Sequence, residues 1–146
     1  MEANQSTLIK SQQFWTNDQI ILSAIIAGPV GGCYLLGRNF NQLGLPGFAK
    51  KIYAAGLLLM IVIATIVFFI PEPIMAKIPK SFFPMGYTLI IACIARFSQK
   101  NLIEEKLKEG NKRFSYWWCL LMTVALLIVQ IPFIVLYTIC LATISA

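Results

Sequence analysis

The stretch Ala27–Gly44 reads AGPVGGCYLLGRNFNQLG and places a proline among glycines inside a long apolar run. Proline cannot donate the backbone hydrogen bond of a helix, and its ring bends the preceding turn. Pro29 therefore predicts a kink or break and frees backbone carbonyls near Ile25. Freed carbonyls at membrane depth need a partner from protein or water, and the hydroxyl of Ser23 is the nearest candidate in sequence.

The same stretch gathers small residues near one face of a helix. Gly28 and Gly32 are four residues apart, the spacing that lets another backbone approach closely. We favour a kinked helix packed against a neighbour. The alternative is a discontinuous helix whose open carbonyls line a solute or ion site, as in transporters. The residues of this stretch that carry either role are Gly28, Pro29, Gly31, Gly32 and Asn39.

The composition of the whole chain is that of a membrane protein. Of its 146 residues, 58% are hydrophobic and 12% are charged, and the mean hydropathy is +0.75. Soluble domains carry about 25% charged residues, and a short chain buries too little surface to hide this much apolar area in its own core. We expect one integral membrane domain over residues 1–146, covered by the lipid bilayer.

Four apolar segments predict an all-α transmembrane bundle, because about 20 residues of helix cross a bilayer. They are uninterrupted runs without the alternation of a membrane barrel. The third is short, so it either spans or is re-entrant. Beyond it, residues 97–109 predict an amphipathic cytoplasmic helix. The four expected spans are about 20–37, 52–70, 82–96 and 116–144.

Positive charge predicts the topology. If all four segments span, nine basic residues lie on one side and three on the other. Lysine and arginine in short loops stay in the cytoplasm, so both termini are expected to face away from it, and the net charge of +6 implies no nucleic-acid partner. Arg38 and Arg96 mark the bilayer interface. The side with nine basic residues holds Arg38, Lys50, Lys51, Arg96, Lys100, Lys106, Lys108, Lys112 and Arg113. The side with three holds Lys10, Lys77 and Lys80.

Residue types suited to catalysis and metal binding are scarce. The chain has no histidine, the commonest general base and metal ligand. Its four cysteines lie in apolar segments without a C-x-x-C pair, where cysteine acts as a small hydrophobic residue. None of the six acidic residues lies inside an expected span. We predict no catalytic residue, no cofactor, no metal site and no enzymatic activity.

The last apolar segment carries a second polar pattern. Thr123, Gln130 and Tyr137 recur every seven residues and therefore share one face of a helix. An amide in hydrocarbon is costly unless it is hydrogen-bonded, so Gln130 must face protein or water. We favour hydrogen bonds between helices; the alternative is a solute pathway along this stripe.

The order of short motifs resembles that of an uncharacterised family of small bacterial multi-pass integral membrane proteins. The longest motif is Gly-Pro-x-x-Gly-x-Tyr-Leu-Leu-x-x-Asn-Phe over residues 28–40. The resemblance implies the bacterial inner membrane and a multi-pass layout, and it brings no reaction, ligand or site residues. Members carry a histidine in the last cytoplasmic loop that this chain lacks, so no histidine-based role is carried over. The other matching positions are Phe14, Gln19-Ile20, Leu43-Gly44, Pro71-Glu72, Ile78-Pro79, Pro84, Tyr87, Gln99, Gly110 and Ser115-Tyr116-Trp117.

For function, we expect a non-enzymatic structural or accessory membrane protein. It would act through helix–helix contacts with a second copy or with another membrane protein. Two alternatives stay open: an oligomeric small-solute channel or permease, and a membrane enzyme acting on lipid. A water-filled axis in an oligomer would favour the channel, whereas a dry bundle would favour the accessory role.

Overall fold

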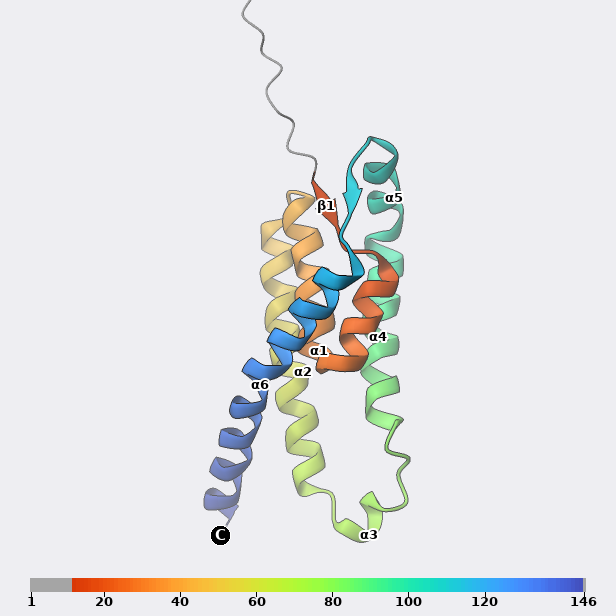
Figure 1. The fold of residues 1–146 in the computed structure, drawn as a ribbon. Coiled ribbons are helices and arrows are strands. Elements are labelled where there is room, and N and C mark those ends of the chain that lie inside the picture. Colours follow the sequence, from red (N-terminus) through yellow and green to blue (C-terminus); the bar gives the residue numbers. More distant parts are fainter. Residues whose placement is uncertain (1–11, 146) are drawn as a thin grey trace, which may run out of the picture.

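The computed structural model describes residues 12–145 and is almost entirely helical (Figure 1). It has three long apolar helices and a shorter one, which confirms the predicted all-α membrane bundle. A two-residue parallel strand pair is the exception among the described elements. The elements are β1 (Gln13–Phe14), α1 (Asn17–Gln42), α2 (Pro46–Phe69), α3 (Glu72–Met75), α4 (Phe82–Ser98), α5 (Lys100–Lys108), β2 (Lys112–Arg113) and α6 (Tyr116–Ser145).

The chain reverses direction inside α1. Ala27 (φ −103°, ψ 16°) and Gly28 (φ 66°, ψ −163°) leave the helical conformation. The Gly28 conformation is essentially restricted to glycine, and Pro29 then begins a second arm, where its missing N–H costs nothing. At the other end of these arms, the Asn39 side chain bonds to the backbone of Trp15. A straight helix would separate Trp15 and Asn39 by about 36 Å, so α1 is a helical hairpin.

This hairpin differs from the single kinked span expected over 20–37. Both ends of α1 lie at the same end of the molecule, and the tip lies near mid-height (Figure 1). The first arm, residues 17–26, extends about 15 Å, half of a hydrocarbon core of about 30 Å. The segment that turns back on itself is therefore the first one and not the third. The third segment, α4, is one uninterrupted helix that carries the chain back from α3 to α5.

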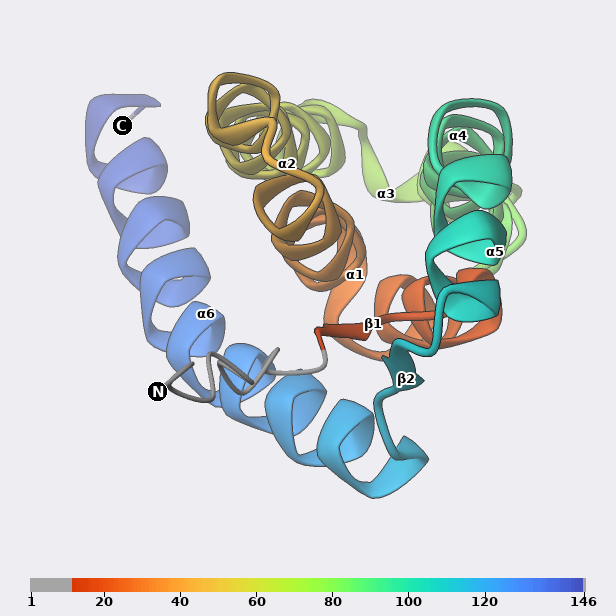
Figure 2. The same ribbon diagram turned by 90° about the horizontal axis from the view of Figure 1, so that it is seen from above.

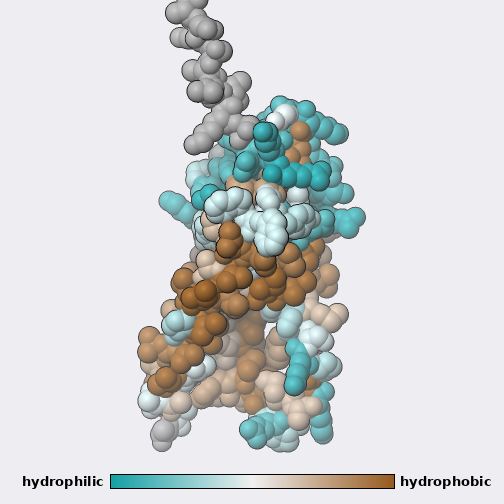
Figure 3. All heavy atoms as spheres, in the orientation of Figure 1, coloured by the Kyte–Doolittle hydropathy of each residue, from teal (hydrophilic) through white to brown (hydrophobic). Residues whose placement is uncertain are grey.

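The hairpin also determines where the first and last described elements lie. β1 lies beside β2 at the end of the molecule that carries α5, whereas α6 finishes at the opposite end (Figure 1). The prediction that both termini face one side also concerns residues 1–11, including Lys10, and residue 146, which lie outside the described residues; for the residues that the structure describes, the first and last elements lie at opposite ends. Nine basic residues lie toward the α5 end, and Lys77 and Lys80 lie near α3. Figure 3 shows the hydrophilic surface gathered at the α5 end, above an apolar band.

The hairpin forms the centre of the bundle. Viewed from above, α1 lies between α2, α4 and α6 (Figure 2), and each of these helices packs mainly against it. Its two arms touch at small residues: a Cβ at Gly31 would lie 2.7 Å from the Ser23 carbonyl oxygen, and one at Gly32 would lie 2.7 Å from the Ala24 Cβ. Gly32 therefore has close neighbours, the nearest of them on the other arm of the same hairpin, whereas nothing lies within 4 Å of a Cβ at Gly28, so the two glycines do not form the predicted packing pair.

Local signals set the ends of the hairpin and of α5. Thr16 and Gln19 form a capping box that begins the first arm, as polar residues before an apolar run predict. The Trp15 ring stacks on Phe114 with ring centroids 4.0 Å apart, which ties the segment before α6 to the hairpin base. The predicted amphipathic helix is α5, with Ile103 buried.

Candidate functional site

The polar residues predicted from sequence hold the hairpin at three levels, beginning at its base. Asn39 is fully buried. The Trp15 N–H donates to Asn39 Oδ1 at 2.9 Å, and Asn39 Nδ2 donates to the Trp15 carbonyl at 2.7 Å. Asn39 Nδ2 also donates to Gln99 Oε1 at 3.3 Å, while Gln99 Nε2 donates to the Leu36 carbonyl at 2.9 Å. Two buried amides therefore join both arms to the end of α4.

The second level joins the middle of the first arm to α6. Thr123 and Ser23 are both buried, and the Thr123 hydroxyl lies 3.0 Å from the Ser23 hydroxyl. Thr123 also donates to the Cys119 carbonyl at 2.7 Å within its own helix. Ser23 was expected to bond to a carbonyl freed by Pro29, but among the described residues its side chain bonds to Thr123 on α6.

The third level is the hairpin tip. Gln130 Nε2 donates to the Ala27 carbonyl at 2.6 Å, and the Gln130 side chain is buried. Because the first arm ends at Ala27, this carbonyl has lost its helical partner. The mid-span amide thus satisfies a backbone group that the reversal at Gly28 and Pro29 leaves free. Tyr137 lies beyond the tip, where its hydroxyl is 2.7 Å from Thr65 and links α6 to α2.

These contacts support the hydrogen-bonding interpretation of the polar stripe. Thr123 and Gln130 bond to the hairpin, and Tyr137 bonds to α2. Sequence reasoning missed two further amides, Gln19 and Gln99, as structural residues. Gln19 Nε2 donates to the Phe114 carbonyl at 2.8 Å. One sequence signal could have identified them. Each is a neutral amide at the end of an apolar run, a position where a solvated surface commonly carries a lysine or glutamate.

Two apolar hollows flank the hairpin tip. One, of about 460 Å³, lies between α2 and α6 below Gly28 and Pro29, and Gln130 and Tyr87 are among its few polar side chains. The other, of about 750 Å³, runs along α4 beside Ile25. They exist because the hairpin ends near mid-depth while the surrounding helices continue. The described residues bring together no cluster of histidine, cysteine, aspartate or glutamate of metal-binding size.

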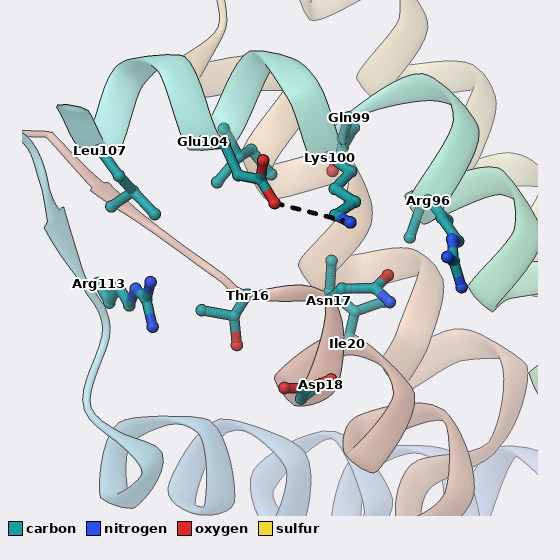
Figure 4. Close-up of a pocket in the computed structure, with 12 residues that line it drawn as sticks. Thr16, Asn17, Asp18, Ile20, Arg96, Gln99, Lys100, Glu104, Leu107 and Arg113 are labelled. Atoms are coloured by element: carbon teal, nitrogen blue, oxygen red, sulfur yellow. Dashed lines mark ion pairs between the residues drawn. The ribbon is translucent and has the colours of Figure 1, made fainter. Parts of the chain in front are cut away.

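A third, polar pocket lies at the basic end of the molecule (Figure 4). It has a volume of about 320 Å³ and is bounded by the first turn of α1, the α4–α5 junction and β2. Arg96, one of the two predicted interface arginines, lines it and is exposed; Arg38, the other, is exposed at the end of the hairpin. On the α5 side, Lys106 donates to Glu109 at 2.7 Å, which raises the pKa of the Lys106 amine.

Comparison with known proteins adds no relative to this description. A scan against protein-family models and searches of curated proteins and of solved structures found no match to the chain. The family resemblance inferred from sequence motifs therefore stays a prediction. Any functional conclusion must come from the geometry of the chain's own residues.

Proposed function

We propose that this chain is a non-enzymatic integral membrane protein with a structural or accessory role, acting through helix–helix contacts with a second copy or another membrane protein. One observation carries the proposal: the polar side chains at membrane depth bond to the hairpin and to neighbouring helices, while the outward faces are apolar. Asn39 and Gln130 each donate to a backbone carbonyl, and the Thr123 hydroxyl is hydrogen-bonded to the Ser23 hydroxyl. A solute pathway would need such groups to face an open passage.

The outward faces supply the contact surface. Large apolar side chains are exposed along α2, α4 and α6, among them Leu58, Leu89 and Val129 at 63–73%. The hollow along α4 also contains Thr88, whose buried hydroxyl has no hydrogen-bond partner among the described residues. Hydroxyls on such faces bond across helix pairs in membranes. A helix from a partner would fill the hollow and satisfy this group.

We further infer that the basic end faces the cytoplasm of a bacterium, with the protein in the inner membrane. Nine basic residues lie toward that end and two near α3, and basic loops stay cytoplasmic. This orientation places β1 on the cytoplasmic side and the end of α6 on the other. It replaces the expectation that both ends of the chain are extracytoplasmic.

Cysteine labelling tests this topology. Cysteines introduced at Gln13, Gln42 and Lys108, in a chain whose native cysteines are replaced by alanine, should react from the cytoplasmic side only. A cysteine at Ser145 should react from the opposite side only. Gln13 and Gln42 are decisive because they flank the hairpin. Labelling of these two positions from opposite sides would mean that the segment crosses the bilayer.

Reconstituted vesicles distinguish the accessory role from the channel. We expect the wild-type protein to conduct ions and small neutral solutes no faster than empty vesicles. Gln130→Leu should remain folded, with its free energy of unfolding changed by no more than about 2 kcal/mol, because it removes both a hydrogen bond and a buried polar group. Wild-type flux that disappears in Gln130→Leu would establish a pathway and overturn the proposal.

Cysteine cross-linking reports helix contacts directly. Cys93 on α4 and Cys140 on α6 are exposed, whereas Cys33 and Cys119 are buried. Oxidation in native membranes should therefore cross-link the chain through Cys93 or Cys140, to itself or to a partner, and alanine at that position should abolish the product. A chain that stays un-cross-linked and monomeric in lipid nanodiscs, with no co-purifying protein, would contradict the accessory role.

A further inference from the structure

The apolar hollow between α2 and α6 lies directly beneath the hairpin tip. Ala27, Gly28 and Pro29 line its upper end, and α2, α4 and α6 continue past this level (Figure 1). These three helices pack mainly against the hairpin, and α2 and α6 make little contact with each other. Below the tip, none of the described helices fills the space between α2 and α6.

The walls of this hollow are two apolar helix faces. On each helix the lining residues recur every four positions, so they share one face. Ala64 and Thr138 are small and leave the space between the faces unfilled. Among the described residues, α4 contributes only Tyr87, so below Tyr87 this side is open to the bilayer. The lining residues at four-residue spacing are Met60, Ala64 and Phe68 on α2 and Gln130, Ile134 and Thr138 on α6.

Little hydrogen-bonding capacity remains in the hollow. Gln130 Nε2 donates to the Ala27 carbonyl, and the Thr138 hydroxyl donates to carbonyls of its own helix. Tyr87, on the α4 side, is the third polar residue of the lining. An apolar cavity does not take up water, and an empty one forfeits dispersion contacts along its lining. The occupant expected in a membrane is therefore hydrocarbon.

The depth of the hollow matches one leaflet of the bilayer. The first arm of the hairpin extends about 15 Å, half of a hydrocarbon core, so the tip marks the middle of the membrane. From Met60, which lines the hollow, α2 continues for about 14 Å to its end at Phe69. The hollow therefore lies in the leaflet opposite the base of the hairpin.

The volume of the hollow distinguishes a lipid chain from a helix. A helix is about 10 Å across, so one turn occupies about 420 Å³, nearly all of the 460 Å³ present. A helix that crosses this leaflet needs about three turns. An extended hydrocarbon chain is about 4 Å across, the contact distance between carbon atoms, so a 15 Å length occupies about 190 Å³. The hollow therefore holds one or two hydrocarbon chains and no helix.

We infer that this hollow is a binding site for the acyl chains of a phospholipid from the leaflet opposite the hairpin base. The chain ends lie beneath Gly28 and Pro29, and the glycerol end lies toward Phe68 and Thr138. The lipid fills the space that remains because the hairpin stops halfway through the membrane. With the basic end in the cytoplasm, this leaflet is the extracytoplasmic one. The site goes beyond the proposed accessory role and does not depend on it.

Photocross-linking of the full chain in lipid nanodiscs tests the site. Two phosphatidylcholine probes carry a diazirine, one at the end of an acyl chain and the other close to the glycerol. The chain-end probe should label Met60 and Gln130, whereas the second probe should label Phe68 and Thr138. Mass spectrometry of proteolytic peptides identifies the labelled residues.

Filling the hollow should exclude the lipid. Ala64→Phe should abolish chain-end labelling of Met60 and Gln130, because the ring occupies the space between the two walls. The matched control is Ala55→Phe, the same change at an exposed position of α2 outside the hollow, which should keep wild-type labelling. Ile134→Phe repeats the test from the opposite wall, so the result does not depend on the folding of one variant.

Three results would overturn the assignment. Labelling confined to Leu58 and Val129, which are exposed on the outer faces of α2 and α6, would show ordinary boundary lipid. Labelling of Met60 that both filling variants leave unchanged would place the probe outside the hollow. A disulfide between two copies through Ala64→Cys, in a chain whose native cysteines are replaced by alanine, would show that a second copy occupies the hollow.

Discussion

Gly31→Ala should destabilise the protein severely, although it adds a single methyl group. The new Cβ would lie 2.7 Å from the Ser23 carbonyl oxygen and 2.9 Å from its hydroxyl. The carbonyl belongs to the backbone of the opposite arm, so this steric overlap can be removed only if the two arms separate. Overpacking of a tight core costs about 1–3 kcal/mol, and separation of the arms would add the loss of contacts along the hairpin. We expect a fall of at least about 3 kcal/mol in the free energy of unfolding.

Gly86→Ala is the matched control for this variant. Gly86 is also inside a helix, and nothing lies within 4 Å of the Cβ that alanine would add. Alanine is favoured over glycine in a helix by up to about 1 kcal/mol, so this variant should be neutral or stabilising. Denaturant unfolding of both variants in the same detergent measures the difference. If both unfold like the wild type, the arms do not touch at Gly31.

The sequence predicted the presence of the break but not its geometry. Pro29 and its neighbouring glycines indicated a kink or a discontinuity, and the structure has a discontinuity. A kink and a reversal share the same residues, because Pro29 is compatible with a bent helix interior and with the first turn of a new helix. The positive φ of Gly28 distinguishes them, and sequence does not display a dihedral angle. Apolar periodicity continues through both arms, so the sequence pattern is the same as that of one long helix.

The topology prediction rested on the same interpretation of this segment. A segment long enough to span was counted as one crossing, which placed the residues before it opposite the basic loops. The charge pattern did not reveal the hairpin because residues 12–16, which precede the first arm, include no lysine or arginine. By contrast, Gln130 was correctly placed against protein, because the cost of an unpartnered amide in hydrocarbon does not depend on topology. Its partner, the Ala27 carbonyl, followed from the reversal and was not predictable.

Asn39→Leu should open the base of the hairpin. The Asn39 side chain accepts from the Trp15 N–H and donates to the Trp15 carbonyl and to Gln99. Leucine has a similar size but satisfies none of these three groups, which are buried. Each buried polar group left without a partner costs about 1–3 kcal/mol. Since the three share one site and their costs do not simply add, we expect a loss of about 3–5 kcal/mol in the free energy of unfolding.

Asn41→Leu provides the comparison, because Asn41 lies two residues further along the same arm and is exposed. Substitutions at exposed sites usually change stability by less than about 0.5 kcal/mol. Hydrogen exchange locates the effect: Asn39→Leu should accelerate exchange at Trp15 and through the first turn of α1, while Asn41→Leu should not. Equal stability and equal exchange in the two variants would mean that packing of the small residues alone holds the arms together, and that the buried amides contribute no net stability.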